Sequence, residues 1–425
     1  MTHSLVTGRV GAECFSTTAQ GVHDLRAEEA LEANAFSALR RSALLEGCKW
    51  DPQVGDTDTL APFPLVLKTR VWKKIAAQAE RLAAEAVLAE EEILSEPRLI
   101  KGLGLPPALR RVLENQVSLT PSPGRIIRFD FHYTTEGWRI SEANSDVPGG
   151  FTEASHFTAM MAKYFPKLRP AGNPGDVWAD ALASAVGTGG RIALLSAPTY
   201  MEDHQVVAYL AARLRERGCC PHLAKPEQIL WRQGVAHLDA AWHRGPVEAI
   251  VRFYQAEWLS QLPVGTGWEF FFRGGKTRVA NPAQAILSES KRFPLVWEKL
   301  STALPTWRAL LPETRDPRQV PWSRDDGWLL KTAFCNTGDT VSMREFMRPG
   351  QWLRTRMAAH LGPGHWIAQR RFESVPVSTS IGPRHVCVGV YTVNGRAAGA
   401  YTRLSPRPII DFAAADVALL LEDDD

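Results

Sequence analysis

The sequence of 425 residues has few cysteines, and they are not regularly spaced. The six are Cys14, Cys48, Cys219, Cys220, Cys335 and Cys387, and no two of them form a C-x-x-C pair. Structural zinc sites and disulfide frameworks both depend on regular cysteine spacing, so this distribution argues against either. The adjacent Cys219 and Cys220 open a predicted strand and are interpreted as structural. We therefore expect a reduced, cytoplasmic protein.

Long hydrophobic runs and a strong net charge are also missing. No apolar stretch approaches the roughly 18 residues that span a membrane. The first residues lack a positive segment followed by an apolar core, so we expect no signal peptide. The formal net charge of +3 is too small to indicate a nucleic-acid partner. The chain is longer than one hydrophobic core usually serves, so several lobes are expected.

Several common catalytic motifs do not occur. The sequence has no H-E-x-x-H zinc motif and no G-x-S-x-G nucleophile turn. The glycines of GTGGRIALL precede a predicted strand, whereas a dinucleotide-binding loop needs them between strand and helix. The segment FFFRGGKT ends like a phosphate-binding P-loop, but Phe270 replaces the first required glycine. We interpret that segment as a solvated turn.

The pattern that remains predicts a mixed α and β protein. Apolar residues recur at three- and four-residue steps between positions 71 and 94, which predicts a long amphipathic helix. A strand over 191–197, a helix over 201–218 and a strand over 247–254 together predict an α/β lobe. A hairpin with an Asn-Gly turn is expected between 385 and 405.

A second predicted hairpin, RFDFHYTTEGWRISEAN, carries polar side chains at alternate positions. Alternation puts Arg128, Asp130 and His132 on one face of the first strand. On the second strand we predict that Trp138, Ile140, Glu142 and Asn144 share a face. If Asp130 pairs with Glu142, then Arg128 pairs with Asn144, and all four side chains project to the same side.

Two opposed carboxylates repel one another unless a cation lies between them. Mg²⁺ prefers oxygen ligands and is usually held by a few carboxylates together with phosphate oxygens and water. Arg128, one strand position away, could bind the same phosphates in a bidentate manner. The alternative is an exposed hairpin in which Arg128 simply neutralises Asp130.

Two lysines could bind phosphate as well. Lys331 ends an apolar strand and precedes a loop of small residues, an arrangement that often contacts nucleotide phosphates. Lys291 lies in a predicted helix earlier in the chain. Either lysine could instead be an ordinary solvated surface charge.

Taken together, these segments resemble the synthetase domain of glutathionylspermidine synthase and its relatives, a branch of the ATP-grasp carboxylate–amine ligases. In that family R-x-D is followed twelve residues later by E-x-N, and Arg128, Asp130, Glu142 and Asn144 keep this spacing. ILSESKRFPLVWEKLSTAL is similar to the family's N-K-x-x-L-P-x-L-W segment, with Ser290 in place of asparagine. LKTAFCNTGDTV is similar to its phosphate loop. The resemblance extends over roughly residues 65–425.

The resemblance implies an ATP-grasp fold with an accessory α/β pre-ATP-grasp lobe and a helical N-terminal region. It also suggests how the chain is divided. We expect a mainly helical region at 1–115, a metal- and phosphate-binding hairpin and helix at 116–175, the accessory lobe at 176–280, and the nucleotide-binding region with its lid at 281–425.

The implied cofactors are ATP and Mg²⁺. Asp130, Glu142 and Asn144 would be the metal ligands, and Arg128 would be a catalytic contact to the transferring phosphoryl group. The implied ATP-binding residues are Arg128, Lys291, Lys331, Thr337, Gly338, Gln369, Arg370, Arg371, Phe372 and Arg403. Glu153, at a predicted helix start, is a catalytic candidate for holding either the ammonium group of the carboxylate substrate or the incoming amine. A first-turn glutamate that complements the helix dipole is the alternative.

The implied function is an ATP- and Mg²⁺-dependent ligase that forms an amide bond between an amino acid or peptide carboxylate and an amine, through an acyl phosphate. Its partners would be these small molecules or peptides, with neither nucleic acid nor membrane, and the oligomeric state is not predicted. The loop TAFCNTG lacks the proline, second glycine and basic residue of the family loop, which leaves a decayed ATP-binding scaffold as one alternative. A kinase that releases the phosphorylated product is another.

Overall fold

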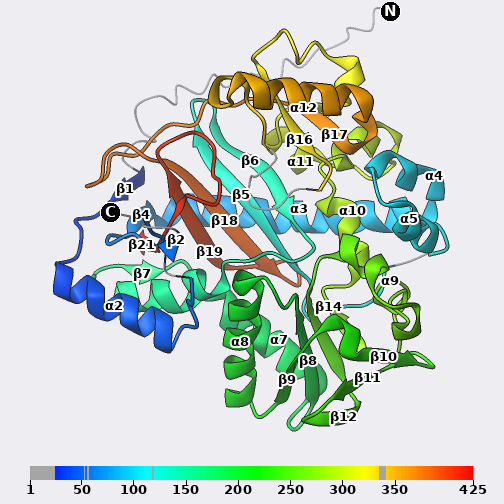
Figure 1. The fold of residues 1–425 in the computed structure, drawn as a ribbon. Coiled ribbons are helices and arrows are strands. Elements are labelled where there is room, and N and C mark those ends of the chain that lie inside the picture. The colour runs from blue at the N-terminus through cyan, green and yellow to red at the C-terminus, as the bar shows by residue number, and fades with distance from the viewer. Residues whose placement is uncertain (1–23, 52, 55–56, 117–118, 335–340, 425) are drawn as a thin grey trace, which may run out of the picture.

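The computed structural model describes residues 24–51, 53–54, 57–116, 119–334 and 341–424. Over these residues helices and several β-sheets pack into a mixed α/β molecule, which confirms the predicted class. In Figure 1 the long helix α3 (Thr69–Ser95) crosses behind a central sheet, a parallel sheet lies below it, and α12 (Pro349–Leu361) lies at the top.

The central sheet is antiparallel, has five strands, and joins two distant parts of the chain. Its strand order is β20-β19-β18-β5-β6. The strands are β5 (Ile126–Thr134), β6 (Gly137–Asn144), β18 (His385–Val393), β19 (Arg396–Ser405) and β20 (Ala415–Val417). The turn between β18 and β19 is the predicted Asn-Gly turn, since Asn394 and Gly395 have φ angles of 49° and 77°. Residues 126–144 therefore lie beside residues 385–417.

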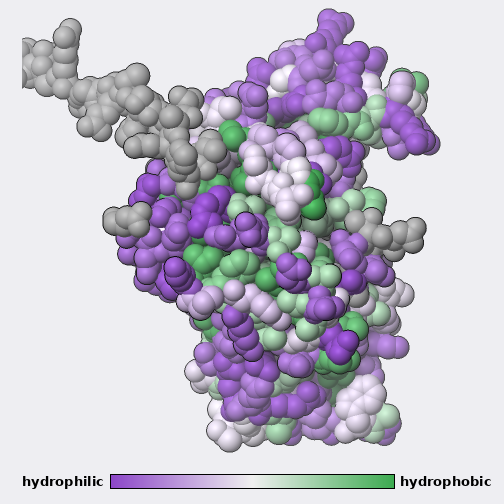
Figure 2. Space-filling model, turned by 90° about the vertical axis from the view of Figure 1, so that its left-hand side faces the viewer, coloured by the Kyte–Doolittle hydropathy of each residue, from purple (hydrophilic) through white to green (hydrophobic). Residues whose placement is uncertain are grey.

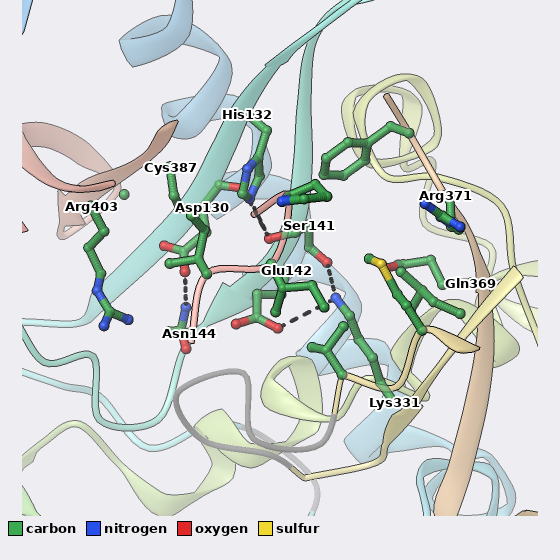
Figure 3. A pocket seen from close by; sticks show the side chains of 18 of the residues that line it. Asp130, His132, Ser141, Glu142, Asn144, Lys331, Gln369, Arg371, Cys387 and Arg403 are labelled. Atoms are coloured by element: carbon green, nitrogen blue, oxygen red, sulfur yellow. Dashed lines mark hydrogen bonds and ion pairs between the residues drawn. The ribbon is translucent and has the colours of Figure 1, made fainter. Parts of the chain in front are cut away.

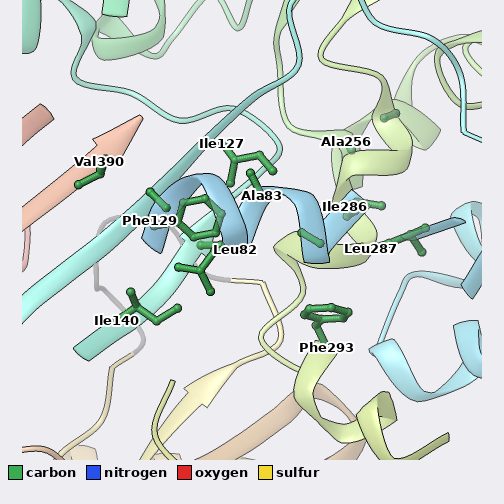
Figure 4. Close-up of a cluster of buried hydrophobic side chains, with 14 of the residues drawn as sticks. Leu82, Ala83, Ile127, Phe129, Ile140, Ala256, Ile286, Leu287, Phe293 and Val390 are labelled. Carbon is green, nitrogen blue, oxygen red and sulfur yellow. The ribbon is translucent and has the colours of Figure 1, made fainter. Parts of the chain in front are cut away.

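Helix α3 covers one face of this sheet and forms the main core with it. Its sequence contains no glycine or proline and many alanines, a composition of high helix propensity. Leu82 packs in one buried cluster with Phe129, Ile140 and Val390 (Figure 4). Burial of each of these side chains contributes about 1.5–3 kcal/mol. The hairpin β5–β6 is thus held rigidly from its apolar face.

The predicted α/β lobe is present, and its two predicted strands and its helix are confirmed. Four parallel strands have the order β14-β13-β8-β9. They are β8 (Arg191–Ser196), β9 (Cys220–Ala224), β13 (Ala249–Phe253) and β14 (Arg278–Ala280), with α7 (Pro174–Val186) and α8 (Met201–Glu216) packed against them. Cys219 and Cys220 stand at the start of β9, as expected.

A smaller sheet of order β15-β17-β16 lies beneath α12 in Figure 1. Its strands are β15 (Thr314–Arg315), β16 (Trp328–Thr332) and β17 (Trp366–Arg370). Tryptophans pack between this sheet and α12, including Trp322 and Trp352, whose ring centroids are 6.0 Å apart. This sheet supplies the second wall of the candidate site.

Both ends of the described chain meet in a fourth sheet. Its order is β1-β4-β21-β7, built from Leu25–Ala27, Leu65–Lys68, Leu419–Glu422 and Arg169–Pro170. The remaining elements are α2 (Ala33–Leu45), β2 (Gln53–Val54), β3 (Thr57–Asp58), α4 (Pro97–Ile100), α5 (Pro107–Leu113), α6 (Thr158–Ala162), β10 (Ile229–Arg232), β11 (Val235–Ala240), β12 (His243–Pro246), α9 (Phe270–Arg273), α10 (Ile286–Glu289) and α11 (Pro305–Leu310).

The helix expected around Lys291 is wrong. Helix α10 ends at Glu289, and Lys291 lies in a turn before a 3₁₀ segment. Pro294 has no N–H to donate to the carbonyl group of Ser290, so a regular helix cannot continue through it. The Lys291 N–H instead donates to the Ala333 carbonyl at 2.8 Å, which ties this turn to the end of β16.

The surface carries mostly polar residues. Figure 2 shows hydrophilic residues over the upper and lower parts of one face and hydrophobic residues gathered across its middle. Among the described helices, none combines the length and hydrophobicity needed to cross a bilayer.

Candidate active site

From Arg128 to Asp130 the hairpin β5–β6 pairs in the predicted register. Asp130 lies opposite Glu142, and Arg128 lies opposite Asn144. On the other side of β5, Asp130 lies opposite Gly389 of β18. All four polar hairpin residues line one pocket between the central sheet and the sheet of β16 and β17.

The prediction that Trp138, Ile140, Glu142 and Asn144 share one face is wrong. The register shifts after Asp130, so that Phe131 pairs with Ile140 and Ser141 is the additional residue of a β-bulge. The bulge reverses the alternation. Ile140 therefore points into the core, while Glu142 and Asn144 point into the pocket.

The bulge also creates contacts of its own. The backbone carbonyl of Ser141 accepts a hydrogen bond from Lys331 Nζ at 3.0 Å, and its hydroxyl lies 3.1 Å from His132 Nε2. Burial lowers the pKa of His132 to about 4, so its ring is neutral at neutral pH. A neutral ring adds no charge to a pocket that already holds several.

Arg128 and Asp130 form a bidentate ion pair. Arg128 Nε and Nη2 donate to the two carboxylate oxygens of Asp130 at 2.7 and 3.1 Å, and Arg128 Nη1 donates to the Gly149 carbonyl at 2.9 Å. Asn144 Nδ2 donates to Asp130 at 3.1 Å, which leaves its amide oxygen pointing elsewhere. Gly389 makes room for this pair, because a Cβ there would lie 2.7 Å from Arg128 Cδ.

Glu142 lies between two lysines. Its carboxylate is 3.6 Å from Lys291 Nζ and 3.7 Å from Lys331 Nζ. Burial alone would raise the pKa of Glu142, but the charges of Lys291, Lys331 and Arg128 lower it to about 2. Glu142 is therefore an ionised carboxylate with a fixed position. Lys291 lines a small neighbouring pocket that shares Glu142 and Lys331 with the main one.

The far end of the pocket is formed by β17 and the residues after it. In Figure 3 the pair Glu142–Lys331 lies between Arg403 on one side and Gln369 on the other. Gln369, Arg370, Arg371 and Phe372 all line this end, together with the apolar Leu329, Met343 and Ile409. The Phe372 ring is 5.1 Å from that of His132. Apolar walls with a few polar groups are typical of sites that bind small molecules.

Arg403 and Tyr401 separate this pocket from a second one. Both residues line both pockets, and the Arg128 guanidinium lies 5.4 Å from the Tyr401 ring centroid. The second pocket contains Glu153, at the start of a five-residue π-helical turn (Glu153–Phe157). Glu153 is buried there and forms an ion pair with Lys49 at 2.6 Å.

The structure thus brings most of the predicted residues together. One pocket is lined by the four hairpin residues, Lys331, residues 369–372 and Arg403; Lys291 and Glu153 lie in the two adjoining pockets. Thr337 and Gly338, predicted in the lid loop, lie outside the described residues. The prediction did not include several lining residues, namely His132, Ser141, Cys387, Gly389 and Tyr401. Alternation places His132 on the face of Arg128 and Asp130, and Tyr401 on the face of Arg403, so strand periodicity could have assigned both residues to the site.

The oxygen donors of the pocket are few. Among the described residues, no group of three or more His, Cys, Asp or Glu side chains is arranged to hold a metal ion. Two carboxylates and one amide converge here, and a metal bound to them would need further oxygen ligands from water or a bound phosphate. Mg²⁺ commonly binds in this way.

A sequence profile for glutathionylspermidine synthase preATP-grasp proteins matches residues 65–421, which is most of the chain. The chain belongs to this family. Every predicted site residue of this family member lies within the matched range, whereas Lys49 precedes it. No curated protein matches the chain significantly.

Among solved structures, the family member is similar to a glutathione synthetase-like effector, GSS30, from Globodera pallida in its apo form. The two share 12% sequence identity and a TM-score of 0.62, over 91% of this chain and 96% of that chain. At this identity the likeness shows a shared fold. A protein from Methylobacillus flagellatus with the provisional name gamma-glutamylcysteine synthetase has 11% identity and a TM-score of 0.42, over 78% of this chain and 86% of that one.

Proposed function

We propose that this family member is an ATP- and Mg²⁺-dependent ligase that joins an amino acid or peptide carboxylate to an amine. The observation that carries the proposal is the convergence of Asp130, Glu142, Arg128, Arg403 and Lys331 on one pocket between two sheets, with Lys291 in the adjoining pocket. Phosphoryl transfer between anions depends mainly on such electrostatic stabilisation and on positioning. The cytoplasm, where ATP is available, is the compartment that we propose.

An ATP-grasp arrangement explains the two walls of the pocket. Arg128, Asp130 and Glu142 come from the central sheet, whereas Lys331 and Gln369 come from β16 and β17. A nucleotide bound here would lie between the two sheets. We propose the four-part division of the chain on the same basis, with residues 176–280 as the pre-ATP-grasp lobe.

Asp130, Glu142 and Asn144 fit a hard divalent cation, since all three can present oxygen atoms. Glu142 stays ionised because its pKa is about 2. Mg²⁺ bound there would neutralise the charge that builds up on the transferring phosphoryl group. Asn144 would contribute its amide oxygen, because its nitrogen is used by Asp130.

The surrounding cations would hold the triphosphate. Lys331 and Lys291 flank Glu142 and would bind phosphate oxygens together with Arg403, while Arg128 would contact the phosphoryl group in transfer. Residues 369–372, with Leu329, Met343 and Ile409, would form the adenine end of the pocket. Apolar side chains suit the faces of a purine.

The reaction would run in two steps. In the first, a carboxylate oxygen of one substrate attacks the γ-phosphorus of ATP; the bond to the bridging oxygen breaks, and ADP leaves with its electron pair. In the second, an uncharged amine attacks the acyl phosphate, the bond from carbon to the phosphate oxygen breaks, and the amine loses one proton. The acceptor would occupy the second pocket, where Glu153 lies behind Tyr401 and Arg403. Exclusion of water protects the acyl phosphate from hydrolysis.

The direct test is release of ADP by purified protein supplied with Mg²⁺, ATP and pooled amino acids, peptides and amines. We expect ADP and phosphate only when both a carboxylate and an amine are present. Asp130→Asn should lower the rate about 100-fold or more, because it removes a charged ligand of the proposed Mg²⁺ and the ion-pair partner of Arg128. Asp239→Asn, which changes an exposed carboxylate of β11, is the matched control and should have no effect.

Other outcomes would overturn the ligase. A phosphorylated product that forms without any amine identifies a kinase. Tight ATP binding without turnover, together with a protein that co-purifies, identifies a scaffold.

A further inference from the structure

Lys49 fills an acidic cluster in the second pocket. Its Nζ lies 2.6 Å from Glu153, 2.9 Å from Asp51 and 3.1 Å from Asp416. The side chains of Lys49, Glu153 and Asp416 are only 5–6% exposed. Burial alone would lower the pKa of Lys49, but Asp416, Glu153 and Asp51 raise it well above its ordinary range. Lys49 is therefore a permanent ammonium group within the cavity.

Each oxygen of the two buried carboxylates has a partner within the protein. Lys49 binds one oxygen of Glu153, and the Thr152 hydroxyl donates to the other at 2.7 Å. Lys49 also binds one oxygen of Asp416, and the Tyr401 hydroxyl donates to the other at 2.6 Å. A substrate ammonium group would therefore compete with Lys49 for these acids.

The cluster lies close to the proposed reaction centre. Tyr401, which donates to Asp416, also lies under the guanidinium of Arg128. Arg403 lines both pockets and has a buried Nε without a hydrogen-bond partner among the described residues. The side chain of Tyr401 therefore lies between Asp416 of the acidic cluster and Arg128, the residue proposed to contact the transferring phosphoryl group.

Lys49 comes from a part of the chain that the family profile does not include. Glu153 and Asp416 lie within the matched range 65–421, whereas Lys49 precedes it. The backbone on both sides of Lys49 is anchored. Lys49 N–H donates to the Ala43 carbonyl at 2.9 Å, and Trp50 N–H donates to the Gln205 side chain at 3.0 Å. The N-terminal region thus inserts a cation into a cavity whose two buried acids, Glu153 and Asp416, come from the rest of the chain.

We propose that Lys49 is a built-in ammonium group that restricts the acceptor to an amine without a second ammonium group. The inference rests on the proposed ligase function and names its substrate class. Within the described part of the chain, Glu202 is the one carboxylate that lines the cavity without contacting Lys49. Glu202 can form an ion pair with one ammonium group, and the other carboxylates that line the cavity already contact Lys49. A monoamine or amino acid therefore fits, and a polyamine such as spermidine does not.

The test is polyamine binding by Lys49→Met, which keeps the length of the side chain and removes its charge. Isothermal titration should show spermidine binding to Lys49→Met at least tenfold more tightly than to the wild-type protein. Lys73→Met, an exposed substitution on α3, is the matched control and should behave like wild type. Equal spermidine affinity of wild-type and Lys49→Met proteins would overturn the proposal.

A second variant decides the matter if Lys49→Met folds poorly. Lys49→Ala leaves space for a small cation, so propylammonium should raise its thermal unfolding midpoint, while propanol at the same concentration should not. Failure of this rescue contradicts the assignment of an ammonium subsite.

Turnover distinguishes this inference from the proposed function. If the ligase proposal holds, the wild-type protein should release ADP with single amines and not with spermidine, and Lys49→Met should gain the spermidine reaction. If no amine supports ADP release in any variant, the ligase proposal fails, and the binding experiments still decide the role of Lys49.

Discussion

Glu142 is the residue at which the proposed metal and phosphate contacts meet, because two buried lysines compete for its carboxylate. Lys331 is 3.7 Å away and is also hydrogen bonded to the Ser141 carbonyl. An anionic ligand that drew Lys331 toward itself would free part of Glu142 for a cation. The pair can therefore hold the pocket in shape and rearrange when nucleotide and metal bind together.

We predict that Lys331→Met weakens binding of ATP in the presence of Mg²⁺ by about 10- to 100-fold, the value of one charge-assisted hydrogen bond. Methionine keeps the apolar stem, so the β16 strand should retain its packing. Titration of ATP into each variant measures the effect. Lys299→Met, on the exposed side of a 3₁₀ turn, is the control. Unchanged affinity in Lys331→Met would show that this lysine does not contact the nucleotide.

His132 makes stability depend on pH. Its pKa is about 4 in the folded protein against 6.5 for an exposed histidine, because burial opposes its charged form. Between these values the unfolded chain binds more protons than the folded one, so stability falls as pH decreases through this window. The loss reaches about 3 kcal/mol at the acid end.

His132→Gln should remove this part of the pH dependence, since glutamine can still contact Ser141 and does not titrate. Urea unfolding at neutral pH and near pH 4 measures it. His365→Gln, at an exposed position, should keep the wild-type difference. Identical slopes for His132→Gln and wild type would contradict the prediction.

At the scale of elements, strand β18 makes room for the site because it has no side chain at Gly389. Gly389 lies directly opposite Asp130, and a Cβ would lie 2.7 Å from Arg128 Cδ and 3.0 Å from an Asp130 oxygen. The bidentate pair thus depends on a glycine in a strand about 260 residues further along the chain.

We predict that Gly389→Ala destabilises the protein by about 1–3 kcal/mol through overpacking and lowers ADP release by displacing Arg128. Gly350→Ala, at the start of α12 where nothing lies within 4 Å of the added carbon, should cause neither effect. Urea unfolding measures the change in stability, and the ADP assay on the same variants measures the change in activity. A stable and fully active Gly389→Ala protein would show that Arg128 tolerates displacement.

The hairpin register at Arg128 and Asp130 could be predicted from the sequence because alternation of charged and aromatic residues on β5 allows few pairings. The bulge at Ser141 could not be predicted, because the composition of the strand does not show one additional residue. This bulge places Trp138 and Ile140 on the opposite face from the one predicted. The turn at Lys291 is fixed by a tertiary hydrogen bond to Ala333. The role of Lys49 could not be predicted from its neighbouring sequence either, because Glu153 and Asp416, the buried acids that it binds, lie more than 100 residues away.

At the scale of the whole molecule, a completely buried ion pair joins the hairpin to the parallel sheet. Asp146, just after β6, binds Arg252 at the end of β13, and both side chains are at most 1% exposed. Asp146 also accepts the Ala256 N–H at 2.7 Å, and Arg252 Nε donates to the Asn281 carbonyl at 3.2 Å. The position of the pocket residues therefore depends on the docking of two lobes.

We predict that Asp146→Ala costs about 3–5 kcal/mol, because it leaves the Arg252 charge buried without its partner. Adding Arg252→Met should recover a substantial part of that loss, since the uncompensated charge is then gone, although the Ala256 N–H stays unpaired. Urea unfolding of the single and double variants measures both values. If the double variant is no more stable than Asp146→Ala, the loss comes from the backbone contact and the lobes are joined by hydrogen bonding of the loop after β13. If the double variant is more stable than Asp146→Ala but binds ATP more weakly than the wild-type protein does, the ion pair serves chiefly to align the hairpin with the parallel sheet. Its contribution to function is then separate from its contribution to stability.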